Sequence, residues 1–384
     1  MYKKRVVFWA ACIGMLLFGI CLITLGSVAS DLRIKLQLDA ISAGTLFSIM
    51  PLGILTGSLL FGPIADKYGY RILLSVSAIF MFTGFEGIAF SSSTGLLKIF
   101  VFLFGLGGGA VNGSTNALVA DISDKDKGAN LSLLGVFFGI GALGMPLITG
   151  MLKNRFSFEV ILSAVGIVPL LTGISFILIK FPPPKQVKGL PMDQSISLIK
   201  DKVLILIALF LFFQSGFEGI MNNWTTTYIM KQQSVPQSYA LYALSSFVVG
   251  MTIMRLFNGS IFRTLSEKKL LIFSFVLLLA GLILLTTGKL FILSVTGLIL
   301  AGAGLASGFP VMLGFVSSRF AGISGTAFSI VLFIALLGNV LINYTMGIIV
   351  QNFGVQHLVT VAFAESVIMI LLCLIILRNV KINS

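Results

Sequence analysis

The stretch GPIADKYGYR, residues 62–71, places a short charged turn between two long apolar runs. Gly62 lets the end of the first run pack closely on a neighbouring helix, and Gly69 permits a sharp turn. Asp66 can accept hydrogen bonds from N–H groups at a helix end, or it can pair with a basic side chain. Arg71 is positioned to anchor the turn at the cytoplasmic face of a membrane. The stretch therefore predicts a short inside loop between two membrane-spanning helices.

The composition around this loop agrees with a membrane protein. The chain has 384 residues, of which 57% are hydrophobic and 10% charged, and its mean hydropathy is +1.07. Soluble domains carry about 25% charged residues, so a water-soluble enzyme is excluded. A spanning helix needs about 20 apolar residues. We expect an all-α polytopic membrane protein with twelve helices, near residues 6–28, 41–62, 72–90, 96–120, 130–152, 158–180, 203–230, 238–262, 270–288, 290–315, 324–349 and 355–377.

The net charge of +13 sets orientation rather than indicating a nucleic-acid partner. With the N-terminus inside, the expected loops place 18 of the 26 Lys and Arg residues on the cytoplasmic side. This bias follows the positive-inside rule, with both termini cytoplasmic. We expect an integral membrane protein of a bacterial inner membrane, where compact loops are common, and no binding of nucleic acid.

An internal repeat divides the chain into two similar halves. The polar segment 181–202 contains three consecutive prolines and separates a six-helix half at 1–180 from a second at 203–384. A shift of 197 residues superposes Gly62 on Gly259 and Arg71 on Lys268. A parallel repeat related by an axis along the membrane normal leaves such a pattern.

The loop motif resembles that of the major facilitator superfamily, G-x-(L/I)-x-D-(R/K)-x-G-x-R between helices 2 and 3. Length, topology and repeat extend the resemblance over the whole chain. The second copy, GSIFRTLSEKK from Gly259, is degraded, with Arg263 at the aspartate position and Ser266 at the second glycine. The resemblance implies that Gly62, Asp66, Gly69 and Arg71 control conformational change, mainly through the first half.

A narrower resemblance lies in the second half. SGFEGIMNNWTTTYI in helix 7 and VVGMTIMRLFNGSIF in helix 8 are similar to segments of fucose/glucose/galactose–proton symporter-like transporters. GLGGGAVNGSTNALV in helix 4 is similar to the glycine ladder of that group. However, helix 1 here has no acid before Asp31, and helix 4 offers Asn112 and Asn116 where that group has a carboxylate. This departure argues against proton coupling through the first half.

Three acids fall inside expected spans, where an ionisable group is costly and usually faces a cavity or a partner. Glu218 lies near the middle of helix 7, with Ser215 and Asn222 on the same helical face. The resemblance implies that helices 1, 4, 7 and 10 line the central cavity. Glu218 is therefore the candidate for substrate binding and proton coupling, against a purely structural role. For Glu86 and Glu365, on helices 3 and 12, the structural interpretation is favoured.

The other polar residues in the spans leave alternatives open. Arg255 can reach the interface, pair with an acid or contact substrate, and we include it among the conformational residues. Asn112 and Asn116 have i, i+4 spacing, which serves either substrate contact or packing between helices. Asn222 is a further candidate for substrate binding. Trp224 can stack on a sugar ring or anchor the outer interface.

No motif for other chemistry is present in the sequence. Cys12, Cys21 and Cys373 lie in apolar runs without metal-ligand spacing. There is no P-loop and no catalytic triad, so we expect no enzyme activity, no cofactor and no metal. Pro310 interrupts the tenth expected helix and Pro146 the fifth.

These features predict a secondary transporter of the major facilitator type that works by alternating access. The expected substrate is a small sugar-like solute bound by Asn112, Asn116, Glu218, Asn222 and Trp224, with protons coupled through Glu218. The alternative is a proton-linked exporter of amphipathic compounds, favoured by the Phe-rich spans. We expect partners limited to substrate, protons and the lipid bilayer, and a monomer.

Overall fold

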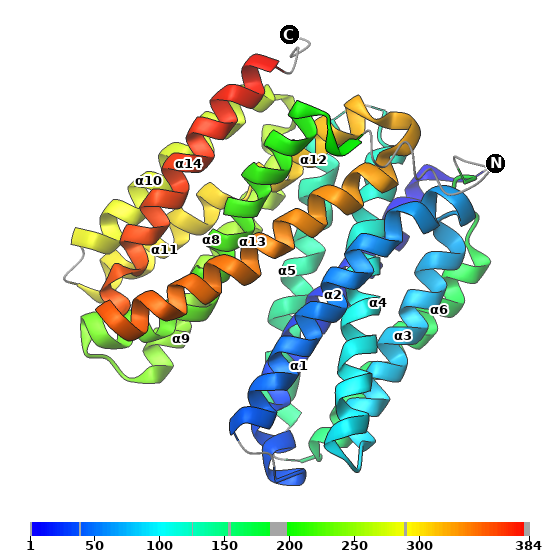
Figure 1. Ribbon diagram of the computed structural model, residues 1–384, viewed down its shortest axis with the longest axis horizontal. Helices are drawn as coiled ribbons and strands as arrows, with labels where there is room; N and C mark the ends of the chain where they lie inside the picture. Colours follow the sequence, from blue (N-terminus) through cyan, green and yellow to red (C-terminus); the bar gives the residue numbers. More distant parts are fainter. Residues whose placement is uncertain are drawn as a thin grey trace. The chain divides into compact units, whose positions relative to one another are not determined.

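The computed structural model describes residues 2–37, 40–124, 126–152, 155–184, 198–287 and 290–379. Long α-helices dominate these residues (Figure 1). They are α1 (Lys4–Lys35), α2 (Ala40–Tyr68), α3 (Tyr70–Phe90), α4 (Thr94–Ile122), α5 (Lys127–Leu152), α6 (Phe158–Leu178), α8 (Lys202–Gln233), α9 (Gln237–Gly259), α10 (Glu267–Thr287), α11 (Phe291–Leu305), α12 (Gly308–Arg319), α13 (Ser324–Phe353) and α14 (Leu358–Asn379). Short 3₁₀ turns at η1 (Ile261–Thr264), η2 (Ala321–Ile323) and η3 (Val355–His357) precede α10, α13 and α14.

The helices confirm the predicted all-α membrane fold. Among the described residues, eleven helical segments are long and apolar enough to cross a membrane, with α11 and α12 counted as one segment. α9 lies at the remaining expected place, residues 238–262. The chain is an integral membrane protein.

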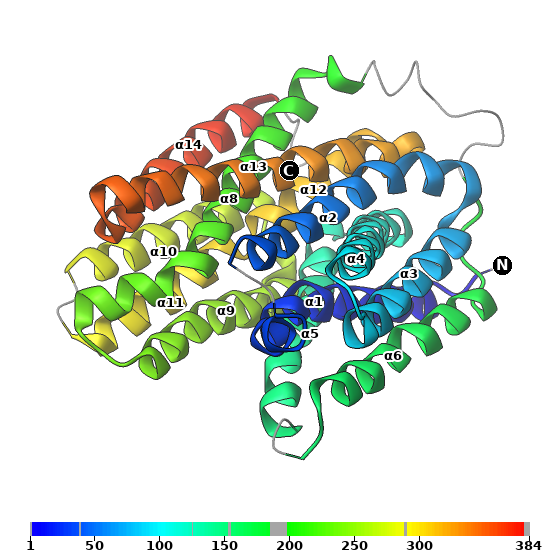
Figure 2. The ribbon, with the colours of Figure 1, turned by 60° about the horizontal axis from the view of Figure 1, so that its bottom comes forward.

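The chain folds as two compact units. The first contains residues 1–122, 137–192 and 320–329, and the second contains residues 123–136, 193–319 and 330–384. In the first unit α4 packs against α1, α2 and α3, and α6 packs against α3. In the second unit α8 packs against α9, α12 and α14, and α11 packs against α9 and α10 (Figure 2). Of the expected linker at 181–202, residues 185–197 lie outside the described part of the chain.

The glycines of α4 allow its backbone to touch that of α2. A Cβ placed on Gly109 would overlap the carbonyl oxygen of Ile54 and lie 2.8 Å from the Ile54 Cα. A Cβ on Gly105 would overlap the carbonyl oxygen of Met50. Small residues permit such close crossings, and in lipid van der Waals packing of this kind is a main source of helix association.

We expect Gly109→Ala to destabilise the protein, because the added methyl group meets backbone that cannot rotate away. Overpacking of this kind costs about 1–3 kcal/mol. Gly95→Ala, near the start of the same helix, is the matched control, since a Cβ there meets nothing within 4 Å. Thermal unfolding in detergent measures both. A Gly109→Ala protein as stable as Gly95→Ala would contradict the close contact.

The break predicted in the tenth helix lies between α11 and α12. Leu305 ends α11 and Gly308 begins α12, five and two residues before Pro310. The ring of a proline clashes with the carbonyl four residues earlier, here that of Ala306, so the regular helix stops there. The carbonyl of Leu305 then accepts a hydrogen bond from Gln214 Nε2 at 2.9 Å. The break is thus stabilised by a side chain of α8.

Asp201 fixes the start of α8. Its Oδ1 accepts hydrogen bonds from the N–H groups of Val203 and Leu204, at 2.9 and 3.0 Å. Its Oδ2 accepts two from Arg319, at 2.8 and 3.2 Å. Burial of the carboxyl opposes ionisation, but the hydrogen bonds from Arg319 and from the helix N-terminus outweigh it and hold the pKa of Asp201 below its usual range.

We expect Asp201 to stabilise the fold less in acid. Because the folded-state pKa is lowered, the contribution of the ionised group is complete above the usual aspartate pKa of about 3.9 and is lost as the pH falls through the lower folded value. Asp201→Asn retains the cap without the charge. The difference in unfolding free energy between wild type and this variant should therefore become smaller as the pH falls below ~4. Asp201→Ala should cost about 1 kcal/mol through loss of the cap at any pH. Thermal unfolding at several pH values tests both, and a gap for Asp201→Asn that does not change with pH would contradict the ionised pair.

Candidate functional site

The predicted loop residues lie against the start of α13, within the first unit. Oδ2 of Asp66 accepts hydrogen bonds from the backbone N–H and the hydroxyl of Thr326, at 2.9 and 2.7 Å. Asp66 is 1% exposed. A Cβ on Gly62 would lie 2.7 Å from the carbonyl carbon of Gly325 and overlap its oxygen, so α2 and α13 touch through backbone. Of the two expected partners of Asp66, the structure shows helix-end N–H hydrogen bonding, where the helix dipole favours a negative charge.

A second acid, missed by the sequence analysis, binds the same helix start. Asp121, the penultimate residue of α4, accepts hydrogen bonds from the hydroxyls of Ser324 and Tyr70, at 2.6 and 2.5 Å. The sequence ALVADISDK carries a signal for it, an acid at the inner end of an expected span. We call Gly62, Asp66, Tyr70, Asp121, Ser324 and Thr326 the α13 cap cluster.

The turn between α2 and α3 brings this cluster together. Gly69 adopts φ +83°, a conformation that glycine adopts without strain, and separates Tyr68 at the end of α2 from Tyr70 at the start of α3. Arg71 lies exposed in the first turn of α3. The turn therefore allows Asp66 and Tyr70, on successive helices, to reach the same helix start.

The degraded second copy makes an equivalent packing contact in the second unit. A Cβ on Gly259 would overlap Leu133 and lie 3.1 Å from the carbonyl oxygen of Ala129, in α5. Under the 197-residue shift of the repeat, Ala129 corresponds to Thr326, the hydrogen-bond partner of Asp66. Arg263, at the position of the aspartate, instead pairs with Asp126 at 3.0 Å, and both side chains are more than 40% exposed. The repeat thus retains the close packing, while a surface ion pair stands where the first copy has a buried aspartate.

In the first unit, Asn112 and Asn116 are joined to each other. Nδ2 of Asn116 donates to the carbonyl oxygen of Asn112 at 2.8 Å and to its Oδ1 at 3.1 Å. Asn112 is 8% exposed, and its own Nδ2 has no hydrogen-bond partner among the described residues. That N–H₂ group remains available to a ligand.

In the second unit, Glu218 and Arg255 attract each other electrostatically. Glu218 of α8 is partly exposed, whereas Arg255 of α9 is 8% exposed. The guanidinium Nη1 of Arg255 also donates to the carbonyl oxygen of Gly135 at 3.4 Å. A Cβ on Gly135 would lie 2.9 Å from Arg255 Cδ, so glycine makes room for the side chain. The attraction to Glu218 agrees with one of the three alternatives for Arg255, pairing with an acid, which stays a prediction.

A polar seam joins α8 to α13 beside Glu218. Asn339 donates to the carbonyl oxygen of Ser215 at 2.9 Å, and Asn223 donates to Asn343 at 2.8 Å. These contacts agree with a packing role for the two α13 asparagines. Asn223 was not singled out from the sequence, which favoured its neighbour Asn222.

The two remaining candidates on α8 have unused polar groups. Asn222 is partly exposed, and its side chain makes no hydrogen bond within the described residues. Trp224 packs near Gly347 of α13, and its indole Nε1 has no acceptor in the same part of the chain. The amide of Asn222 remains able to bind a ligand, whereas the indole N–H of Trp224 is buried.

The two other membrane acids differ in their surroundings. The two carboxyl oxygens of Glu86 share the hydroxyl of Ser163 as a donor, at 2.9 and 3.0 Å, which agrees with a structural role. Glu365 is 4% exposed, and both its carboxyl oxygens lack a partner in the described chain. Across the described ranges, no group of three His, Cys, Asp or Glu residues is placed to hold a metal ion.

Comparison with known proteins now adds to this geometry. Residues 7–285, well over half of the chain, match the Major Facilitator Superfamily. A D-xylose transporter of Levilactobacillus brevis is 30% identical over 33% of this chain and 28% of its own length. A 4-hydroxybenzoate transporter of Pseudomonas putida is 27% identical over 45% of this chain and 39% of its own length. The match thus spans only about a third of the length of these curated relatives.

A solved structure extends the likeness over the whole fold. The fucose:proton symporter of Escherichia coli superposes with a TM-score of 0.81 at 16% identity, over 97% of this chain and 99% of its own. The family and the fold are those of membrane transporters, which are not enzymes. The resemblance found in the loop at residues 62–71 is confirmed, and the chain belongs to the Major Facilitator Superfamily.

Proposed function

We propose that this protein is a proton-coupled symporter of a small sugar-like solute. The observation that carries the proposal is the pair of a partly exposed acid, Glu218, and a buried cation, Arg255, in an apolar bundle. A carboxyl in such a place serves as a site where a proton alters the charge balance. The names of the D-xylose relative and of the fucose:proton symporter support a sugar and a proton as the transported species.

The chemistry of the proposed cycle follows from this pair. Ionised Glu218 attracts Arg255, whereas protonated Glu218 no longer does. Proton binding therefore weakens one interaction between α8 and α9 and leaves a neutral carboxyl that can donate to and accept from sugar hydroxyls. Asn222 and Asn112 would supply further hydrogen bonds, and Trp224 a face on which a sugar ring stacks.

The conformational part of the cycle is assigned to the α13 cap cluster. We place this cluster at the cytoplasmic side, with both termini cytoplasmic, in a bacterial inner membrane. Opening towards the cytoplasm then requires Asp66 to leave Thr326, and closing restores the two hydrogen bonds. Gly62, Gly69 and Arg71 shape and anchor the same turn. The proposed working unit is a monomer.

A second candidate is transport of an organic acid. The buried Arg255 offers a positive charge to a carboxylate, and a 4-hydroxybenzoate transporter is among the relatives. In that case a protonated Glu218 leaves Arg255 to the substrate. Both candidates use the same pair of residues, and they differ in whether the substrate carries a charge.

Uptake into proteoliposomes separates the two candidates. Labelled D-xylose, L-fucose, D-glucose and 4-hydroxybenzoate would each be supplied with and without an inward proton gradient. We expect at least one sugar to accumulate only with the gradient and to leak out when a protonophore is added. Accumulation of 4-hydroxybenzoate alone would favour the organic-acid candidate. If no compound of either class is accumulated, both are wrong, and the exporter alternative would be tested by efflux.

A further inference from the structure

The buried face of α14 carries one acid in an otherwise weakly polar row. The row comprises Leu358, Val359, Ala362, Glu365, Ser366, Met369, Cys373 and Ile376, at the spacing of one helical face. The hydroxyl of Ser366 is satisfied by the carbonyl oxygen of Ala362 at 2.7 Å. Glu365 is 4% exposed, and neither carboxyl oxygen has a hydrogen-bond donor among the described residues. Glu365 is therefore the one member of this row whose polar atoms are unsatisfied.

No charge on the neighbouring elements compensates Glu365. Helix α14 packs against α8, α10 and η3. The titratable groups on these elements are Lys202, Glu218, Tyr228, Lys231, Glu267, Lys268, Lys269 and His357. Within the described residues, none of them donates a hydrogen bond to the Glu365 carboxyl. The Tyr228 hydroxyl is already used, because it donates to the carbonyl oxygen of Leu285 at 3.1 Å.

An ionised carboxylate is poorly tolerated in such a place. Burying a charge without a partner costs several kcal/mol, as an order of magnitude, whereas the neutral acid loses much less. Glu86 is the internal comparison, because its two oxygens share the hydroxyl of Ser163 as a hydrogen-bond donor. The two acids look alike in the sequence, but only Glu86 has the partners that a structural role requires.

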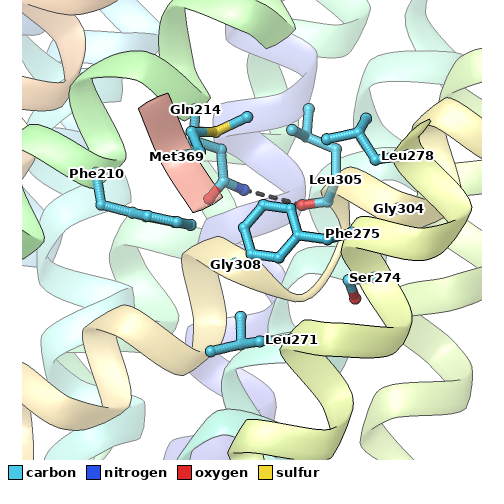
Figure 3. Close-up of a pocket in the computed structure, with 10 residues that line it drawn as sticks. All are labelled: Phe210, Gln214, Leu271, Ser274, Phe275, Leu278, Gly304, Leu305, Gly308 and Met369. Carbon is cyan, nitrogen blue, oxygen red and sulfur yellow. Dashed lines mark hydrogen bonds between the residues drawn. The ribbon is translucent and has the colours of Figure 1, made fainter. Parts of the chain in front are cut away.

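A small, mostly apolar cavity has Met369, one turn along the same face, in its lining. Met369 lines it together with Gln214, Ser274, Leu305 and Gly308, at the break between α11 and α12 (Figure 3). Its volume is about 10 Å³, close to the space that one water molecule needs. Nε2 of Gln214 is bonded to Leu305, while its Oε1 is buried and has no donor in the described chain. The cavity therefore offers a water molecule one free acceptor, the Oε1 of Gln214.

We propose that Glu365 is a second proton-binding site, separate from Glu218, that holds its proton in the resting protein. As the pH rises, the carboxyl O–H bond breaks, the proton combines with a hydroxide ion from the solvent to form water, and the carboxylate remains until a proton returns. The site goes beyond the proposed symport, because it uses neither the substrate nor Glu218.

Infrared spectroscopy of the purified protein in lipid tests the proposal. The readout is the C=O stretching band of protonated carboxyl groups, recorded from neutral to alkaline pH. We expect wild type to show a band at neutral pH that is absent in Glu365→Gln, kept in Glu86→Gln and lost on alkaline titration. A Glu365→Gln spectrum with the full wild-type intensity in this band would overturn the proposal.

Two further measurements keep the test decisive. Glu365→Asp retains a carboxyl in a changed position, so its band should shift in frequency even if Glu365→Gln folds poorly, and an unshifted band would count against Glu365. Glu365→Gln should also release one proton fewer per protein on alkaline titration, and an unchanged number would overturn the proposal. Glu218→Gln should keep the Glu365 band, so failure of the proposed symport through Glu218 leaves a different spectral result from failure of this site.

Discussion

Glu218→Gln is expected to abolish proton-driven accumulation of the substrate while exchange of substrate across the membrane continues. Glutamine has nearly the same shape as a neutral glutamic acid and can hydrogen-bond to a sugar, but it cannot gain or lose a proton. A gradient of one pH unit supplies about 1.4 kcal/mol per proton, which supports about tenfold accumulation if one proton accompanies each substrate. We expect this ratio to fall from about ten to one in the variant.

Counterflow and gradient-driven uptake in proteoliposomes measure the two parts separately. Glu86→Gln is the matched control, because Glu86 is also a membrane acid but is held by Ser163. It should keep the wild-type accumulation ratio. If Glu218→Gln still accumulates substrate about tenfold, Glu218 is not the coupling acid, and Glu365 becomes the next residue to replace. If exchange is lost as well, the carboxylate itself is needed for substrate binding.

Arg255 should be needed for the same coupling. Its attraction to Glu218 exists only while Glu218 is ionised, so removal of the charge separates proton binding from the contact between α8 and α9. In Arg255→Met the apolar stem is retained and Glu218 loses its cationic partner. An acid left without its partner in an apolar bundle favours the neutral form. The accumulation ratio of Arg255→Met in gradient-driven uptake is therefore expected to be closer to that of Glu218→Gln than to that of wild type.

Much of the fold could be predicted because apolar length is a strong signal in a membrane chain. Each expected span corresponds to a helix, and the break in the tenth was located through Pro310. The helix is interrupted from Ala306, four residues before Pro310, and not at Pro310 itself. The reason is that the ring of a proline clashes with the carbonyl group four residues earlier. The 197-residue repeat likewise pointed to Gly259, and the structure gives Gly259 a contact equivalent to that of Gly62.

Partners of polar side chains were harder to predict. Whether Asp66 meets a helix end or a base depends on the rotation and height of α2 against α13, which hydrophobic periodicity does not specify in a span that is apolar all round. Asp121 and Gln214 were missed for the same reason, since each binds a group more than 90 residues away in the chain. Glu86 and Glu365 received the same interpretation, because the sequence does not show that the hydroxyl of Ser163 lies beside Glu86 and that no such donor lies beside Glu365.

Asp66→Ala is expected to shift the protein away from the state in which α2 caps α13. The substitution removes two hydrogen bonds to a buried charge and leaves the N–H of Thr326 without its partner. Hydrogen bonds to charged groups contribute about 1.5–3 kcal/mol each, so loss of even one shifts the equilibrium by about tenfold or more. The initial rate of uptake should fall by a similar factor, because the cycle then lacks a stable capped state.

Alkylation of a cysteine placed at Ser329 reports this change directly. Ser329 is 2% exposed and lies beside Gly62, and the three native cysteines are buried, so the background reaction is low. In the Asp66→Ala background the alkylation rate should rise about tenfold. Asp126→Ala is the matched control from the second repeat: its exposed pair with Arg263 contributes about 0–1 kcal/mol, so the rate should change by less than about fivefold. If Asp66→Ala and Asp126→Ala changed the alkylation rate equally, the buried Asp66 would stabilise the contact with α13 no more than an exposed ion pair does. The gating role would then be assigned to Asp121 and its two hydroxyl donors.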